Sequence, residues 1–148
     1  MQRILDSIEE LVPVGSSFEF CVKGYSMLPQ LGHRGDIIIV RRVDADENIV
    51  GRIAMFRGKR RNIIVHRVIS VVNGEVTLRG DGNLYQVERC PRNEIIGVVE
   101  SVRRRGGNIV SCTSQKWQRR ERRWLRLPLI VRRYTLAIMR RILNLMNK

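Results

Sequence analysis

The sequence predicts a mainly β protein whose sheet is rolled or barrel-like, with a short helix before it and a basic amphipathic helix after it. Short β-branched runs alternate with turn signals as far as residue 111, which is typical of such domains. From about Gln115 the periodicity becomes helical. A chain of 148 residues suffices for one core and an appendage. We therefore expect a β domain over residues 1–114 and a helical tail over residues 115–148.

The first expected element is a short amphipathic helix in the stretch MQRILDSIEELVPV. Its acidic side chains interrupt the apolar run that a secretory signal would need. Pro13 and Gly15 then break the helix. Residues 18–23 alternate apolar and polar side chains, which indicates a half-buried strand. Gly24 ends this strand, and residues 25–29 follow as an irregular turn.

Six further strands are expected, most of them short runs rich in Val and Ile. Asn73-Gly74, between two of these runs, is the strongest short-range signal for a hairpin. A glycine-containing loop at residues 80–83 and a turn at residues 104–107 separate the later runs. The expected strands are residues 37–40, 53–56, 63–72, 75–79, 95–103 and 108–111.

The tail carries almost all of the net charge of +14. Residues 1–100 hold 14 basic and 13 acidic side chains, whereas residues 101–148 hold 14 basic side chains and one acid. On a helical wheel, the apolar residues after Pro128 fall on one arc and the arginines on the other, which predicts a basic amphipathic helix. The apolar arc consists of Val131, Tyr134, Ile138, Met139, Ile142, Leu143, Leu145 and Met146.

Cysteine count and hydropathy exclude several classes of protein. Three cysteines without a CxxC pair indicate neither a disulfide framework nor a zinc knuckle. The sequence contains neither a cluster of metal ligands nor a phosphate-binding loop. It therefore implies no metal and no organic cofactor. No uncharged apolar stretch reaches the roughly 18 residues of a membrane-spanning helix. The positive charge instead indicates an anionic partner, either lipid headgroups or nucleic acid.

Three segments carry groups suited to nucleophilic catalysis: GYSMLP at residues 24–29, VHRVI at residues 65–69 and RGDGN at residues 79–83. A serine hydroxyl becomes a good nucleophile when a neighbouring base removes its proton. Neutral histidine suits that role at cellular pH. We therefore expect Ser26 to be the nucleophile and His66 its general base.

Other residues of these segments would assist this pair. Asp81 would hold the imidazole in its reactive tautomer. The turn that contains Gly24 and Met27 would leave backbone N–H groups free to stabilise an oxyanion. Taken singly, each residue also has a structural interpretation. Ser26 and Asp81 are ordinary turn residues, and His66 fits a strand position where hydrogen bonds satisfy the ring.

Taken together, the segments resemble the signal peptidase family of serine peptidases. The shared features, in order, are Gly-x-Ser-Met-x-Pro, Gly-Asp before an apolar strand, Val-His-Arg-Val-Ile and Gly-Asp-x-Asn, between Val22 and Val99. The resemblance implies an endopeptidase that cleaves leader, signal or precursor peptides through an acyl-enzyme on Ser26. It also implies that the substrate binds extended beside a strand, with small side chains flanking the scissile bond.

The resemblance is to the histidine type of this family, found in archaea and the endoplasmic reticulum. His66 stands where the Ser–Lys type and the LexA-type repressors have lysine. Lys23 and Lys59 are the weaker candidates for the base. His33, the other histidine, is expected to be solvated.

The sequence departs from the family in two respects. Val87 stands where a second acid is common, so that Asp81 or Glu88 must assist His66, or the site works as a dyad. A weakened or inactive pseudo-enzyme is the alternative. The transmembrane anchor that signal peptidases normally carry is also missing.

The basic tail would replace this anchor by binding an anionic membrane surface. Basic segments favour the cytoplasmic leaflet, so we expect a cytoplasmic protein, peripheral at the inner face of the membrane. Alternatively, the tail packs on the β domain or a partner, or binds nucleic acid. The candidate lipid contacts are Trp117, Trp124, Arg132, Arg133, Arg140 and Arg141.

The rival class is a non-enzymatic β module that binds nucleic acid or membrane through its basic tail. An aromatic content of 5% is low for stacking on single strands, which makes nucleic acid the weaker partner. A LexA-like self-cleaving regulator is disfavoured because the 17 residues before the first strand are too few for a DNA-binding helix pair. The substrate, the cleavage site and the oligomeric state stay open.

Overall fold

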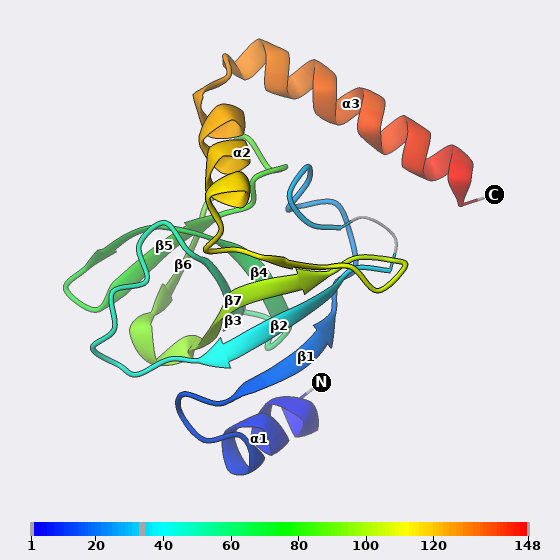
Figure 1. The fold of residues 1–148 in the computed structure, drawn as a ribbon. Helices are drawn as coiled ribbons and strands as arrows, with labels where there is room; N and C mark the ends of the chain where they lie inside the picture. The colour runs from blue at the N-terminus through cyan, green and yellow to red at the C-terminus, as the bar shows by residue number, and fades with distance from the viewer. Residues whose placement is uncertain (1, 33–34, 148) are drawn as a thin grey trace.

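The computed structural model describes residues 2–32 and 35–147, and the protein is mainly β (Figure 1). Its strands form one antiparallel sheet in the order β1-β2-β7-β3-β4-β5-β6, with β8 paired to β7. The strands are β1 (Ser17–Cys21), β2 (Ile37–Arg42), β3 (Ile53–Arg57), β4 (Ile63–Val72), β5 (Glu75–Arg79), β6 (Glu88–Pro91), β7 (Ile95–Arg103) and β8 (Ile109–Ser111). The helices are α1 (Gln2–Leu11), the 3-10 turn η1 (Arg92–Glu94), α2 (Gln115–Arg126) and α3 (Leu129–Met146).

The predicted N-terminal helix and all seven predicted strands are present, with small shifts at their ends. The predicted hairpin joins β4 to β5, and its two central residues, Asn73 and Gly74, adopt φ values of 49° and 76°. Positive φ at both positions is what a two-residue hairpin requires. Strand β6 was not predicted, because its sequence, ERCP, is short and mostly polar.

The expectation of a barrel is wrong, because the sheet does not close. Strands β1 and β6 are the two ends of the sheet and do not pair with each other in the described chain. Irregularities of register in β2, β3 and β4 bend the sheet instead. The bent sheet encloses two hydrophobic clusters, one around Ile38 and Trp117 and the other around Phe56 and Leu78. A free edge of β1 therefore remains beside the first cluster.

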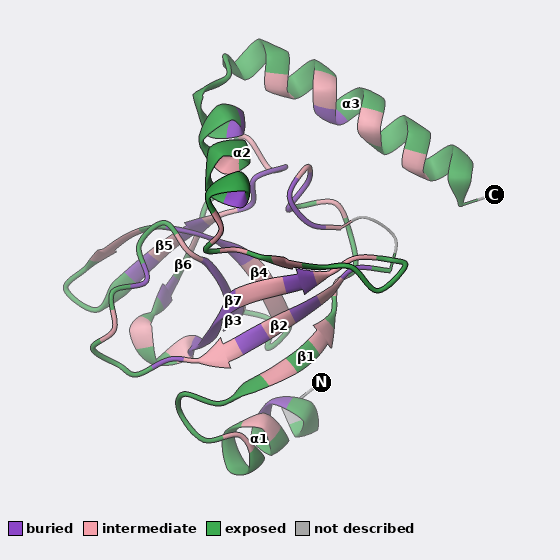
Figure 2. Cartoon of the chain, viewed as in Figure 1, coloured by how far each residue is buried: buried purple, intermediate pink, exposed green. Residues whose placement is uncertain are grey.

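The tail consists of two helices that meet at Pro128, and both pack on the domain. The polar segment before Pro128 is helix α2. Ser114 caps its N-terminus: the Oγ atom of Ser114 accepts a hydrogen bond from the backbone N–H of Trp117 at 3.2 Å. Figure 2 shows that the buried residues of α2 and α3 lie on the sides of these helices that face the rest of the protein. None of the described helices is long and apolar enough to cross a membrane.

Candidate active site

The turn at residues 24–29 presents Ser26 to solvent directly before two buried residues. Met27 and Leu28 are 2% and 0% exposed, so their burial fixes the turn while the Ser26 side chain stays outside. Gly24 enters the turn at φ 90°, which favours glycine. A side chain on Gly24 would meet nothing, so this glycine serves the backbone path and not the packing.

Backbone N–H groups suited to an oxyanion lie in the same turn. The hydrogen bonds of the turn use the N–H groups of Leu28, Gln30 and Leu31. These bonds leave out the N–H groups of Ser26 and Met27. Among the described contacts, no hydrogen bond within the turn occupies the N–H group of Met27, which is the group predicted to contribute to an oxyanion site. Gly24 contributes to the conformation of the turn.

The second segment places His66 in β4, opposite Ala54 of β3. The imidazole is 5% exposed and lies near the ring of Phe56, with 6.1 Å between ring centroids. Its Nδ1 atom is buried and has no hydrogen-bond partner among the described residues. Burial lowers the pKa of His66, and the charges of Glu88 and Asp81 oppose this shift. The ring is therefore kept neutral at cellular pH, as a general base must be.

The third segment joins the first two at Gly80. A Cβ atom on Gly80 would lie 2.2 Å from the carbonyl oxygen of Ser26 and 3.2 Å from Nε2 of His66. Both atoms thus lie too close to this position for a side chain, so that only glycine fits at residue 80. No hydrogen bond between the Ser26 hydroxyl and His66 is among the contacts of the described chain; such contacts are often loose before substrate binds.

The loop at residues 80–83 is bound directly to the nucleophile turn. The N–H of Gly82 donates a 2.8 Å hydrogen bond to the carbonyl of Ser26. A Cβ atom on Gly82 would lie 2.6 Å from the carbonyl oxygen of Tyr25. The structure therefore uses Gly80 and Gly82 for close approach between two backbones.

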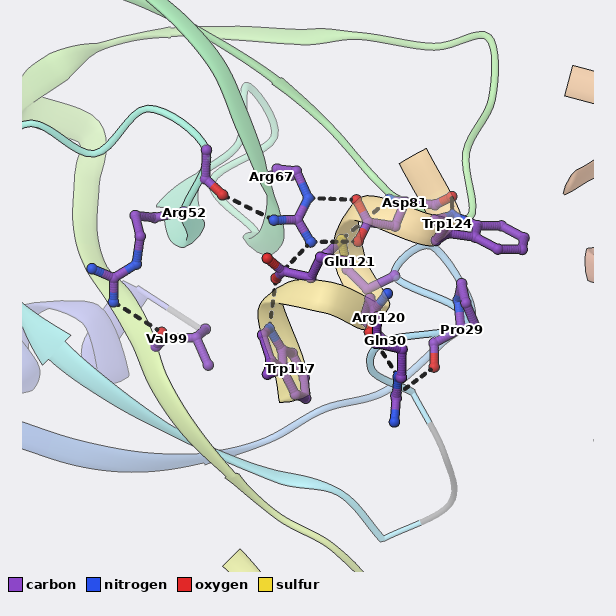
Figure 3. A network of polar contacts seen from close by, with 12 residues as sticks. Pro29, Gln30, Arg52, Arg67, Asp81, Val99, Trp117, Arg120, Glu121 and Trp124 are labelled. Atoms are coloured by element: carbon purple, nitrogen blue, oxygen red, sulfur yellow. Dashed lines mark hydrogen bonds and ion pairs between the residues drawn. The ribbon is translucent and has the colours of Figure 1, made fainter. Parts of the chain in front are cut away.

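Asp81 does not occupy the orienting position that we expected for it. Its carboxylate accepts hydrogen bonds from Nε and Nη2 of Arg67, at 2.8 and 2.6 Å (Figure 3). Asp81 and Arg67 are 4% and 3% exposed, so this is a buried ion pair. The other contacts of Arg67 are with the carbonyl of Gly51 and with Glu121 of α2. Asp81 therefore influences His66 through its charge and through the position of its loop.

Glu88, the alternative acid, also acts without a hydrogen bond to the ring. It lies in β6 opposite Leu78, and its charge raises the pKa of His66 against the effect of burial. Val87 is 45% exposed and offers no acid. The structure thus brings the segments of Ser26 and His66 together at Gly80, and the charges of Asp81 and Glu88 act on the ring through space.

The other candidate bases and nucleophiles are less suitably placed. Burial raises the pKa of Cys90 to about 11 and that of Cys112 to about 12, so both thiols stay protonated. Lys59 lies in the turn between β3 and β4, away from the groove described below. Lys23 does line that groove with Ser26 and remains the second candidate for the base. His33 lies outside the described residues.

An apolar groove of about 530 Å³ runs past Ser26. Its walls are residues 20–24 at the end of β1 and residues 63–65 of β4, with Ile4 of α1 at one side. Strand β5 pairs with β4 only from Arg67 onward, so the earlier part of β4 has no strand partner on that edge in the described chain. The groove therefore lies between two strand edges.

Several predicted lipid contacts are wrong, because they hold the tail on the domain. Trp117 and Trp124 are 1% and 5% exposed. Their indole N–H groups bind Glu121 and the carbonyl of Asp81. The two rings are seven residues apart and share one helix face, so burying them docks α2.

The predicted arginines divide into two pairs. Arg140 donates a 2.8 Å hydrogen bond to the carbonyl of Gly82, and the Nε atom of Arg132 is buried. These two are therefore oriented toward the protein. Arg133 and Arg141 are exposed and stay available to a partner.

Sequence reasoning missed Arg67 and Glu121, which hold the loop at Asp81. One signal was present: an arginine stands in the middle of the apolar run VHRVI. A charged residue buried in such a run needs a partner of opposite charge. Comparison of the chain with family models and with curated proteins finds no match.

Proposed function

We propose that the protein is a serine endopeptidase that cleaves leader or precursor peptides through an acyl-enzyme on Ser26, with His66 as general base. The observation that carries this proposal is the convergence at Gly80. The position that a Cβ atom on Gly80 would occupy lies 2.2 Å from the carbonyl oxygen of Ser26 and 3.2 Å from Nε2 of His66. An exposed hydroxyl, a neutral imidazole and a substrate-sized groove thus occur together.

In the first half of the reaction, Nε2 of His66 accepts the hydroxyl proton of Ser26 while Oγ attacks the scissile carbonyl. The N–H groups of Ser26 and Met27 stabilise the resulting oxyanion. Asp81 and Glu88 favour the imidazolium form through space. The proton then passes to the leaving amine, and the C–N bond breaks to leave the acyl-enzyme.

In the second half, His66 accepts a proton from water, and the hydroxide attacks the ester carbonyl. The proton returns to Oγ of Ser26 as the carboxylic acid product leaves. Because Nδ1 of His66 has no hydrogen-bond acceptor in the part of the chain that the structure describes, the ring is held by packing against neighbours such as Phe56. We therefore expect a lower turnover rate than that of a triad, in which an acid orients the ring.

The substrate binds as an extended strand in the groove between β1 and β4. Unpaired strand edges bind extended peptides through main-chain hydrogen bonds. The lining is mostly apolar, so apolar or small side chains fit beside Ser26. This agrees with the substrate class that the signal peptidase resemblance implies.

We place this activity at the cytoplasmic face of an anionic membrane. The support is the basic charge of residues 101–148, which hold 14 basic side chains and one acid. Basic surfaces are attracted to the anionic cytoplasmic leaflet. A nucleic-acid-binding module is less well supported, because Trp117 and Trp124 are buried and offer no stacking surface.

The direct test is cleavage of candidate precursor peptides, followed by mass spectrometry. Wild type should cleave, and Ser26→Ala and His66→Ala should each lose at least about a thousandfold in kcat/KM. Ser7→Ala, on exposed α1, is the matched serine control and His33→Ala the histidine control. Lys23→Ala should retain activity.

Two results would contradict the proposal. One is full activity in Ser26→Ala. The other is loss of activity in Lys23→Ala together with retained activity in His66→Ala, which would assign the base to lysine. The non-enzymatic alternative predicts no cleavage by wild type with any precursor peptide.

A further inference from the structure

Helix α3 presents two chemically different faces. Leu136 is buried, and Met139 and Leu143 pack with it against Leu28 and Trp124. Two polar contacts fix the same face: Asn144 bonds the hydroxyl of Tyr25 at 3.0 Å, and Arg140 bonds the carbonyl of Gly82. This face binds α3 to the two loops of the candidate active site.

The opposite face is apolar and uncovered. Tyr134, Ile138 and Leu145 are 65%, 60% and 64% exposed. They are four and seven residues apart, spacings that keep them on one side of a helix. We call this side the outer face of α3; it consists of Ile130, Tyr134, Ile138, Ile142 and Leu145, with Arg141 as its nearest charged residue. Figure 2 shows the exposed side of α3 turned away from the domain.

The charge around the outer face indicates which kind of partner binds it. Glu121 is the last acidic residue of the chain, and eight basic residues follow it. A second copy of this chain would bring two strongly positive surfaces together, which is unfavourable. Anionic headgroups would instead be attracted to Arg141, which lies on the outer face between Ile138 and Leu145 along the helix, and to Arg133 at its edge.

We infer that α3 lies in the headgroup region of an anionic bilayer, with its outer face in contact with the acyl chains. Its inner face stays bound to the protein, so α3 separates the two loops from the lipid. A helix is about 10–12 Å across. Tyr25 touches α3 directly, so Ser26 is held close to the membrane surface. On the proposed function, the substrate is therefore a precursor peptide presented at the membrane.

The test is sedimentation of the full chain with vesicles of one part phosphatidylglycerol to two parts phosphatidylcholine. Wild type should bind these vesicles at least about tenfold more tightly than pure phosphatidylcholine vesicles, and high salt should weaken the binding. The double variant Ile138→Ser/Leu145→Ser should bind at least about tenfold more weakly than wild type. The matched control, Val72→Ser/Ile109→Ser, removes exposed apolar side chains elsewhere and should bind like wild type.

Three outcomes would overturn the inference. The first is equal binding by wild type and the outer-face variant. The second is equal binding to anionic and neutral vesicles. The third is a wild type that light scattering finds dimeric, an outer-face variant that is monomeric, and no binding to vesicles by either. Each vesicle experiment is repeated with Ser26→Ala protein, which lacks the proposed nucleophile. Failure of lipid binding is therefore distinguishable from failure of the peptidase.

Discussion

Arg67 and Asp81 form a buried, bidentate ion pair, with nitrogen–oxygen distances of 2.8 and 2.6 Å. Arg67 follows His66 in β4, and Asp81 follows Gly80 in the loop that touches Ser26. This pair therefore holds the strand of the proposed base against the loop behind the nucleophile. It fixes the geometry of the site without contacting the reacting atoms.

The first prediction concerns this ion pair. Asp81→Ala should lower the free energy of unfolding by about 3–5 kcal/mol, because it leaves a buried guanidinium without its principal partner. The double variant Arg67→Met/Asp81→Leu should recover most of this loss, since it removes both charges. Urea unfolding of wild type and the two variants measures both effects. If Asp81→Ala kept full stability but lost activity as completely as His66→Ala, Asp81 would be a catalytic residue.

The second prediction concerns pH. The base acts in its neutral form, which predominates above its pKa, so kcat/KM should rise with pH and then level off. Burial lowers the pKa of His66, so the midpoint of this rise should lie below about 6.5. Glu88→Gln removes a charge that raises this pKa, and should move the midpoint to lower pH. A midpoint well above 7 would indicate a different base.

The third prediction concerns close packing at Gly80. Gly80→Ala places a methyl group 2.2 Å from the Ser26 carbonyl, so the loop and the turn must separate. Misplacement of about 1 Å costs on the order of a hundredfold in rate, and we expect kcat to fall accordingly. Gly74→Ala is the control: its Cβ meets no atom, although its φ of 76° favours glycine. That variant should lose about 1 kcal/mol of stability and keep its activity.

The fourth prediction concerns the docking of the tail. Trp117→Ala should lower the free energy of unfolding by about 3–5 kcal/mol, because it empties a core position. Tyr134→Ala, on the outer face of α3, should change it by less than about 0.5 kcal/mol. Thermal or urea unfolding distinguishes the two. Equal, small effects would mean that the tail is an independent appendage.

The strands were predictable because their patterns are local. The run at residues 63–72 and the Asn73-Gly74 turn specify β4 and its hairpin without reference to the rest of the chain. The failure of the sheet to close was not predictable, because closure depends on register shifts and on contacts between distant strands. A helical tail was predicted over residues 115–148, but not its division into two helices, because the segment of α2 holds only three apolar residues among many arginines.

The site was predictable in part. The positions of Ser26 and His66 follow from short motifs, and the structure brings their segments together at Gly80. The partner of Asp81 was not predictable, because strand alternation places Arg67 on the face opposite His66. On that face, Glu121 of α2 accepts a hydrogen bond from Arg67. Such an arrangement depends on tertiary contacts between residues far apart in the sequence.

The most direct test is to trap the acyl-enzyme. Wild type is mixed with a precursor peptide, quenched in acid within the first turnover, digested and mapped by tandem mass spectrometry. The N-terminal product should be attached as an ester to Ser26, and the adduct should be absent from Ser26→Ala and strongly reduced in His66→Ala. An adduct on another residue, or cleavage that persists in Ser26→Ala, would contradict the assignment of Ser26 as nucleophile.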